Sequence, residues 1–229
     1  MCRMIVGIGK IETEKILNDM VKISKGRNEL HELNPKSGEF THEDGWGIAY
    51  LDSENNWQIY KSVEPIHKDR KKIDELKNIR PRAIVVHVRR ATLGSVNIEN
   101  TQPFVIDTDK GKYIFSHNGT IYDDLEEQKT LKGDSDSVKF FEKLLNEIDE
   151  KPNIGESIKS LQNFTSSNFF LVTPTKIVIG ENFKKDPMYY TLKVFKSEHS
   201  IMVSSEELPN YSEAPWVPLT NQSVLEIEY

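Results

Sequence analysis

Cysteine is almost absent from this sequence: Cys2 is the only one among 229 residues. A single cysteine excludes a disulfide within the chain and any zinc site built from cysteine ligands. The two histidines that stand in polar clusters, His87 and His117, have no partner at the spacing of metal ligands. We therefore expect no metal and no cofactor. We also expect a cytoplasmic protein, because a free thiol survives in a reducing compartment.

The sequence also lacks an excess of basic residues and a long apolar run. Its 30 Lys and Arg residues against 36 Asp and Glu residues give a formal net charge of −6. The densest basic run, Lys68 to Lys72, falls within a predicted helix, so no basic face for a nucleic acid is expected. No apolar stretch approaches the roughly 18 residues of a membrane span, and the N-terminus has no signal-peptide core. We expect neither a nucleic-acid nor a membrane partner.

The order of the apolar patterns predicts an α+β fold with antiparallel sheets and helices layered on them. Strands, then helices, then strands follow one another without a repeat or a break in composition, so one domain over residues 1–229 is expected. Strands are predicted at 3–9, 46–51, 57–63, 83–88, 104–107, 112–116, 169–173, 176–180, 189–195, 201–204 and 224–227. Helices are predicted through 17–21 with a stop at Gly26, and at 68–79, 135–148 and 154–163.

Cys2 stands directly behind Met1, which is normally removed when the next residue is this small. Removal would leave Cys2 with a thiol and a free α-amine on the same residue. A thiol with a pKa of about 8.5 needs a nearby base, and an α-amine with a pKa of roughly 7.7–8.0 could serve as one. The alternative interpretation is a small, buried and inert residue that opens a strand.

Polar clusters stand at the ends of predicted strands or just after them: Cys2-Arg3, His87 to Gly94, Ser116 to Gly119 and Gly133 to Ser137. Arginine offers a planar fork for a carboxylate, and an Asn-Gly pair can aim a side-chain amide and a backbone N–H at one oxyanion. An aspartate at a helix start can anchor an ammonium group. With a thiol, these groups describe a site for an α-amino acid whose side chain carries a reactive carbonyl.

Each cluster also has a structural interpretation. Arg89 and Arg90 could be surface charges that close a strand, and Asn118-Gly119 is a common turn pair. The segment from Asp134 to Ser137 has the composition of a helix N-cap. Trp46, with glycines on both sides, could equally be a core residue.

Taken together, the clusters resemble the class II glutamine amidotransferases, which are N-terminal-nucleophile glutaminases. The similarity extends along nearly the whole chain, in the order of the family and closest to its short, stand-alone branch. The residues that carry it are Met1-Cys2-Arg3, Asp44-Gly45-Trp46-Gly47, Arg89-Arg90-Ala91-Thr92 with Gly94, Thr101-Gln102-Pro103-Phe104, Ser116-His117-Asn118-Gly119, Gly133-Asp134-Ser135-Asp136-Ser137, and Val203-Ser204-Ser205-Glu206 followed by Trp216.

The resemblance implies a four-layer αββα fold, with two antiparallel sheets between helix layers, and it implies roles. Cys2 would be the nucleophile, with its own α-amine as base through a water. Asn118 and the Gly119 N–H would form the oxyanion hole. Arg89 would bind the α-carboxylate of the substrate and Asp136 its α-ammonium. Thr92, His117 and the backbone near Trp46 and Gly47 would also contact the substrate.

The implied reaction hydrolyses the γ-amide of glutamine or of a γ-glutamyl compound through a thioester and releases ammonia or an amine. Leu93 departs from the histidine that often follows this motif in the amidotransferases that make amino sugars. The chain has no room for a synthase domain, so either a separate subunit accepts the ammonia or hydrolysis is itself the purpose. Two alternatives stay open: an N-terminal-nucleophile hydrolase of another amide, and a catalytically silent glutamine-binding or scaffold protein, which would retain Met1.

Overall fold

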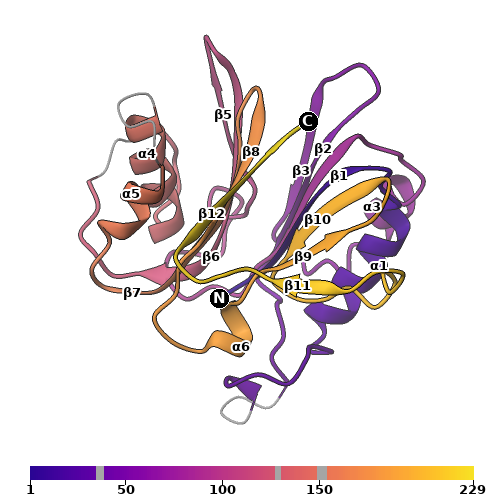
Figure 1. Cartoon of the computed structure of the whole chain (residues 1–229), viewed down its shortest axis with the longest axis horizontal. Helices are drawn as coiled ribbons and strands as arrows, with labels where there is room; N and C mark the ends of the chain where they lie inside the picture. Colours follow the sequence, from indigo (N-terminus) through magenta and orange to yellow (C-terminus); the bar gives the residue numbers. More distant parts are fainter. Residues whose placement is uncertain (35–38, 127–129, 149–153) are drawn as a thin grey trace.

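Two antiparallel sheets lie face to face between two layers of helices in this protein (Figure 1). The computed structural model describes residues 1–34, 39–126, 130–148 and 154–229. Helices α1 and α3 cover the outer face of one sheet, and α4 and α5 cover the outer face of the other (Figure 1). The predicted α+β fold with four αββα layers is confirmed.

The first sheet has seven strands in the order β11-β9-β10-β1-β4-β2-β3. Strand β1 lies at its centre between β10 and β4, and every pair in this sheet is antiparallel. The bounds are Arg3–Gly9 for β1, Trp46–Leu51 for β2, Trp57–Ser62 for β3, Ala83–Val88 for β4, Lys193–Lys196 for β9, Ser200–Ser204 for β10 and Trp216–Pro218 for β11.

The second sheet has five strands in the order β12-β8-β7-β6-β5, also antiparallel throughout. Its long central strands, β6 and β7, are buried on both faces along most of their length. The bounds are Phe104–Thr108 for β5, Gly111–Ile121 for β6, Phe164–Val172 for β7, Lys176–Glu181 for β8 and Ser223–Glu228 for β12.

Alternating residues of the central strands supply two different cores, as the two-residue period of a strand requires. In β1, Met4 and Val6 belong to the core between the sheets, whereas Ile5 faces α1. In β7, Phe170 faces the other sheet and Phe169 faces α4. Each sheet is therefore apolar on both sides, which is why helices cover both outer faces.

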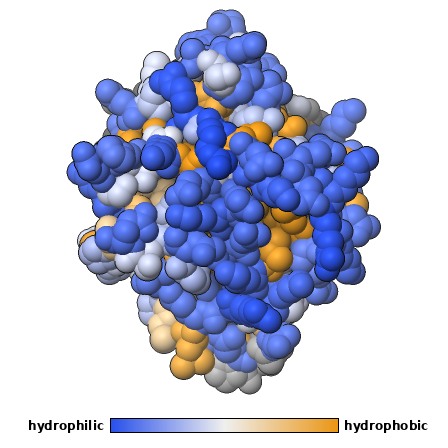
Figure 2. Space-filling view, turned by 90° about the vertical axis from the view of Figure 1, so that its right-hand side faces the viewer, coloured by the Kyte–Doolittle hydropathy of each residue, from blue (hydrophilic) through white to orange (hydrophobic). Residues whose placement is uncertain are grey.

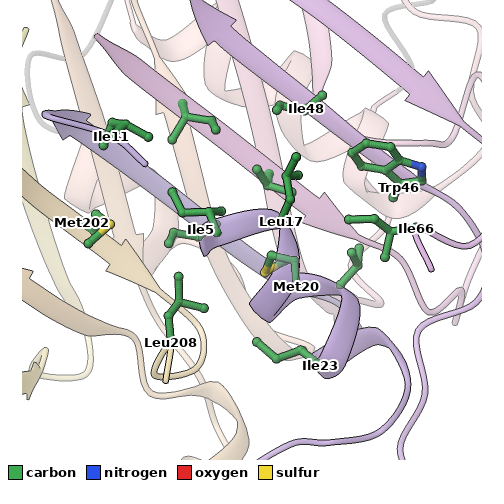
Figure 3. Packing of buried hydrophobic residues seen from close by; sticks show 14 of the residues in the cluster. Ile5, Ile11, Leu17, Met20, Ile23, Trp46, Ile48, Ile66, Met202 and Leu208 are labelled. Atoms are coloured by element: carbon green, nitrogen blue, oxygen red, sulfur yellow. The ribbon is translucent and has the colours of Figure 1, made fainter. Parts of the chain in front are cut away.

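The helices bury one apolar stripe each against the sheets. Helix α1 (Thr13–Ser24) directs Leu17, Met20 and Ile23 at the sheet beside Ile5 (Figure 3), and α3 (Arg70–Leu76) packs next to it. Helices α4 (Asp136–Ile148) and α5 (Ile154–Lys159) cover the second sheet. Within the described residues, we find no helix long and apolar enough to cross a membrane.

Several predicted elements differ from the structure. The strand predicted at 189–195 is a helical turn, α6 (Pro187–Tyr190), followed by β9, because Pro187 favours the first helical position and the Tyr189 and Tyr190 N–H groups both bond to the Asp186 carbonyl. The helix predicted at 154–163 ends at Lys159, and β7 begins at Phe164 rather than 169. The polar cluster Ser116 to Gly119 lies inside β6 and does not follow a strand end.

The aromatic packing beneath α4 gives a stability prediction. The Phe141 ring stacks on Phe115 with centroids 4.8 Å apart, and both side chains are fully buried. We expect Phe141→Ala to lower the free energy of unfolding by about 3–5 kcal/mol, because it leaves a cavity in the core. Urea unfolding measures this. The control is Asn146→Ala on the exposed side of the same helix, which should change stability by less than about 0.5 kcal/mol.

Candidate active site

Cys2 lies just before the central strand β1, at the point where the two sheets meet. Arg3 pairs with Val88 of β4, and Val88 pairs with Trp46 of β2, so Cys2, Arg89 and Gly45 come together at one edge of the sheet. The Cys2 side chain is 7% exposed, and its Sγ lies 3.9 Å from the Arg90 carbonyl oxygen.

Asn118 of β6 reaches Cys2 from the opposite sheet. The Cys2 backbone nitrogen donates to Asn118 Oδ1 over 2.7 Å. Because that nitrogen can only donate, the oxygen of the Asn118 amide must face it, and Nδ2 must point the other way. Asn118 Nδ2 is buried and has no hydrogen-bond partner. The amide therefore holds the Cys2 nitrogen with one end and offers an unused donor with the other.

Gly119 follows Asn118 where the chain leaves no space for a side chain. A Cβ at this position would lie 1.7 Å from the Ser166 carbonyl oxygen on the neighbouring strand β7. The register of β6 against β7 shifts between Gly119 and Ile121, which marks a local irregularity in the strand pair. Irregular pairing of this kind re-aims groups beside functional sites.

A small pocket brings most of the predicted site residues together. Cys2, Arg89, Thr92, His117, Gly119 and Asp136 all line it. The segment that carries Arg89 is fastened to the loop before β2: Asp44 N donates to Arg89 O over 3.0 Å, Arg89 N to Gly45 O over 2.9 Å, and Ala91 N to Asp44 Oδ2 over 2.8 Å. Asp44 and Gly45 thus set the position of the arginine.

Arg89 and Asp136 place opposite charges on this pocket. Arg89 is 3% exposed, and its guanidinium donates to the Ser95 and Leu93 carbonyls at 3.1 and 3.5 Å, with no carboxylate partner in the described part of the chain. Asp136 opens helix α4 and accepts the Ile121 N–H over 2.8 Å. A buried guanidinium that is bound only to carbonyl groups is suited to receive an external carboxylate.

Thr92 and His117 complete the lining. Thr92 Oγ1 lies 2.9 Å from Thr120 Oγ1. His117 Nε2 lies 3.3 Å from the Ser166 carbonyl oxygen, and because a carbonyl can only accept, Nε2 carries the proton. Nδ1 of the neutral ring therefore accepts from Ser137 Oγ over 2.8 Å. Burial lowers the pKa of His117 to about 4, so the ring is neutral near pH 7. Both ring nitrogens are occupied, and the ring braces β6 against α4.

Trp46 and Gly47 do not line the pocket. Trp46 is fully buried in the core beneath α1 (Figure 3), where its Nε1 donates to Asp69 Oδ2 over 3.2 Å. Gly47 is needed for a different reason, because a Cβ there would lie 2.3 Å from the Gln102 carbonyl oxygen. The structure thus keeps these two residues apart from the others predicted with them. The described residues also contain no group of three side chains suited to hold a metal ion.

Tyr189 and His42 hold the Cys2 carbonyl, and neither was predicted as a site residue from the sequence. The Tyr189 hydroxyl donates to the Cys2 carbonyl over 2.9 Å, and His42 Nε2 lies 3.2 Å from the same hydroxyl. Burial raises the pKa of Tyr189 well above 10 and lowers that of His42 well below 6.5, so both side chains are neutral. Since the hydroxyl proton of Tyr189 is used at the Cys2 carbonyl, His42 Nε2 is the donor to the tyrosine oxygen.

Arg3 supports the same tyrosine from within β1. Its guanidinium lies 4.0 Å from the Tyr189 ring centroid, donates to the Tyr189 carbonyl over 2.8 Å and pairs with Glu206 at 3.0 Å. Arg3 and Glu206 are both almost completely buried. A signal was available: an arginine inside an apolar strand has to find a buried acid, and Glu206 stood among the residues that carried the resemblance.

Buried neutral histidines make the stability of the fold sensitive to acid. Burial lowers the pKa of His87 to about 3 and that of His117 to about 4, against 6.5 in an unfolded chain. Between about pH 6.5 and pH 4 the unfolded chain therefore binds more protons, and each histidine removes about 1.4 kcal/mol of stability per pH unit as the pH falls. We expect urea unfolding in half-unit steps of pH to show this loss, and substitution of the exposed His199 by Gln to leave it unchanged.

Glu181 acts in the opposite direction across part of this range. Burial raises its pKa to about 7, so the folded chain binds a proton that the unfolded chain does not. Glu181→Gln should therefore steepen the loss of stability toward acid. A free energy of unfolding that stays constant from neutral to weakly acid pH would contradict the neutral state of the buried histidines.

The Tyr189 hydrogen bond to Cys2 gives a second prediction. Tyr189→Phe leaves the Cys2 carbonyl without its donor, so stability should fall by about 1–2 kcal/mol. The released N-terminus should also expose the buried thiol, so iodoacetamide should alkylate Cys2 faster. The matched control is Tyr211→Phe, which removes a hydroxyl bonded to a different backbone carbonyl, that of Glu12, at 3.2 Å. Equal alkylation rates in the two variants would show that Tyr189 does not position Cys2.

Known structures share this arrangement of sheets and helices. The structure of the allosteric regulatory enzyme of purine biosynthesis superimposes with a TM-score of 0.72 at 19% identity, over 99% of this chain and 47% of that one. A glutamine aminotransferase class-II domain protein from Silicibacter pomeroyi superimposes with a TM-score of 0.58 at 14% identity, over 100% of this chain and 99% of that one. At these identities the likeness establishes the fold.

Sequence similarity establishes the family. An amidophosphoribosyltransferase of Methanocaldococcus jannaschii is 28% identical over 174 residues, which cover 72% of this chain and 36% of that protein. The chain spans between 22% and 45% of the length of the curated relatives that it matches. The family model of the class II glutamine amidotransferases matches residues 29–168, more than half of the 229 residues. The chain therefore belongs to the class II glutamine amidotransferase family.

Proposed function

We propose that this protein hydrolyses the γ-amide of glutamine or of a γ-glutamyl compound through a Cys2 thioester. The observation that carries the proposal is the Asn118 side chain: Oδ1 holds the Cys2 nitrogen at 2.7 Å, and Nδ2 is a buried donor with no partner. A preorganised donor beside a buried thiol is what an oxyanion requires. We also place the protein in the cytoplasm, because the thiol has to stay reduced.

Cys2 supplies the nucleophile and the base once Met1 has been removed. The nitrogen that donates to Asn118 then becomes an α-amine held beside Sγ. Burial already lowers the pKa of the Met1 amine in this place below 8.0. The same burial around the Cys2 amine would favour its neutral form near pH 7, and a neutral amine can accept the thiol proton through a water.

Arg89 and Asp136 orient the glutamyl part of the substrate. The Arg89 guanidinium binds the α-carboxylate, and Asp136 binds the α-ammonium, because both line the pocket that contains Cys2. Thr92 lines the same pocket and contacts the side chain of the glutamyl group. This pair of opposite charges favours a substrate with a free α-amino-acid group. It disfavours the alternative, an N-terminal-nucleophile hydrolase that acts on amides without such a group.

The reaction then proceeds in two steps. Sγ attacks the γ-carbonyl carbon, Asn118 Nδ2 and the Gly119 N–H stabilise the oxyanion, and the C–N bond breaks as the amine passes a proton to the leaving nitrogen. Water next attacks the thioester, releasing glutamate and restoring the thiol. The nitrogen product either leaves or passes to an accepting subunit. The longer relatives named amidophosphoribosyltransferase support such a partner.

Asn118→Asp tests the oxyanion donor. The substitution keeps an acceptor for the Cys2 nitrogen but removes the Nδ2 donor, so turnover of glutamine should fall by about 10²–10³-fold. Steady-state release of glutamate measures it, with the exposed Asn146→Asp as the control. Turnover within a few-fold of the parent in Asn118→Asp would exclude Asn118 as oxyanion donor.

Intact mass separates the enzyme from a silent binding protein. A glutamine-mimicking diazo-ketone should add once, on Cys2, to a chain that has lost Met1, and Cys2→Ser should abolish both the adduct and turnover. A chain that keeps Met1, binds glutamine and forms no adduct would instead be a binding or scaffold protein.

A further inference from the structure

Met1 lies beside the Cys2 sulfur, against the Arg90 carbonyl. Its amine donates to the Arg90 carbonyl oxygen over 2.6 Å, and Cys2 Sγ lies 3.9 Å from the same oxygen. The Met1 nitrogen and the Cys2 sulfur are therefore neighbours around one carbonyl group. Removal of Met1 frees both this acceptor and the space of the methionine side chain.

Met1 lines the same pocket as Cys2 and Arg89, and its side chain packs against an apolar cluster whose members do not line that pocket. The cluster consists of Leu33, Phe40, Tyr189 and Tyr190, with Phe183 at its margin. The first four are at most 9% exposed. Its polar groups are occupied: the Tyr189 hydroxyl donates to the Cys2 carbonyl, and the Tyr190 hydroxyl lies 3.2 Å from Thr165 Oγ1. The cluster therefore accepts an apolar group and offers these hydroxyls to nothing else.

The proton path of the reaction points to the same place. The α-amine of Cys2 takes the thiol proton and returns it to the leaving nitrogen, so that nitrogen has to lie on the amine side of the sulfur. Met1 is bonded to this amine and fills the space beyond it. A leaving amine with an N–H could bond to the Arg90 carbonyl as the Met1 amine does.

We propose that the space occupied by Met1 is the leaving-group subsite, and that the substrates are γ-glutamyl amides of amines with an apolar substituent. This rests on the proposed function above and adds the class of leaving group. Sγ attacks the γ-carbonyl carbon, the C–N bond breaks, the thiol proton passes through the α-amine to the nitrogen, and a neutral alkylamine leaves. Water then cleaves the thioester to glutamate and the thiol, so no other reactant is needed.

A series of γ-glutamyl alkylamides tests the subsite on the processed chain, whose loss of Met1 is verified by intact mass. Glutamine, γ-glutamylmethylamide, γ-glutamylethylamide and γ-glutamylbutylamide extend the leaving group stepwise, and butyl matches the unbranched methionine side chain in length. We expect kcat/KM to rise by about threefold to fourfold for each added methylene. γ-Glutamylglycine, which is of similar size but charged, should gain nothing over glutamine.

Phe183→Ala tests whether this cluster is responsible. Phe183 is partly exposed at the margin of the cluster and stacks on Tyr190 with centroids 6.5 Å apart. We expect the ratio of kcat/KM for the butylamide to kcat/KM for glutamine to fall about fivefold in this variant. Met188→Ala, at a residue of the same segment that is 58% exposed and outside the cluster, is the control and should keep the parental ratio.

The outcomes separate the two proposals. If the processed chain hydrolyses glutamine but shows no gain along the alkyl series, the leaving-group subsite is wrong and the proposed function stands. A gain that Phe183→Ala does not reduce would place the subsite elsewhere and overturn the assignment to this cluster. If no member of the series is hydrolysed and Cys2 takes up no diazo-ketone, the proposed function fails and the subsite fails with it.

Discussion

The hydrogen bond between the Cys2 nitrogen and Asn118 Oδ1 is the contact on which the candidate site depends, because it joins the two sheets. Cys2 precedes the central strand of one sheet, and Asn118 lies within a central strand of the other. The proposed nucleophile comes from one sheet and the proposed oxyanion donor from the other, so they can act on the same carbonyl group only when the two sheets are packed together. The core between the sheets, with Met4 and Val6 facing Phe170, sets their separation. The αββα packing therefore has a direct chemical consequence.

A buried polar framework holds that contact in place and has to be satisfied internally. Arg3 pairs with Glu206, bonds to the Tyr189 carbonyl and lies over its ring. A buried ion pair of this kind is weak as a source of stability, since desolvation offsets the attraction, yet loss of one partner is costly. Here the pair fixes the position of Tyr189, and the Tyr189 hydroxyl in turn donates to the Cys2 carbonyl.

Much of this could be predicted from the sequence, and the failures have a common cause. The family and the two-sheet fold followed from motifs in order, and Cys2, Arg89, Thr92 and Asp136 do meet at one pocket. The predicted end of the strand at 116 was wrong, because Asn118 and Gly119 have the composition of a turn but continue the strand. Asn118 bonds to Cys2, and Gly119 lies against Ser166 of β7. Tyr189 and His42 gave no local signal, because their role arises only when segments distant in the sequence are packed together.

The face that carries α1 and α3 is mostly hydrophilic, with small hydrophobic areas between the polar side chains (Figure 2). The apolar cluster beside Cys2 differs in kind, because the chain itself covers it with Met1. In the proposed mechanism, this one residue blocks the amine that acts as base and occupies the space into which the leaving group would go. Its removal would create the base and open the subsite in one step. If the proposed function holds, Met1 marks the leaving-group half of the substrate, whereas the pocket with Arg89 and Asp136 would constrain only the half that all γ-glutamyl compounds share.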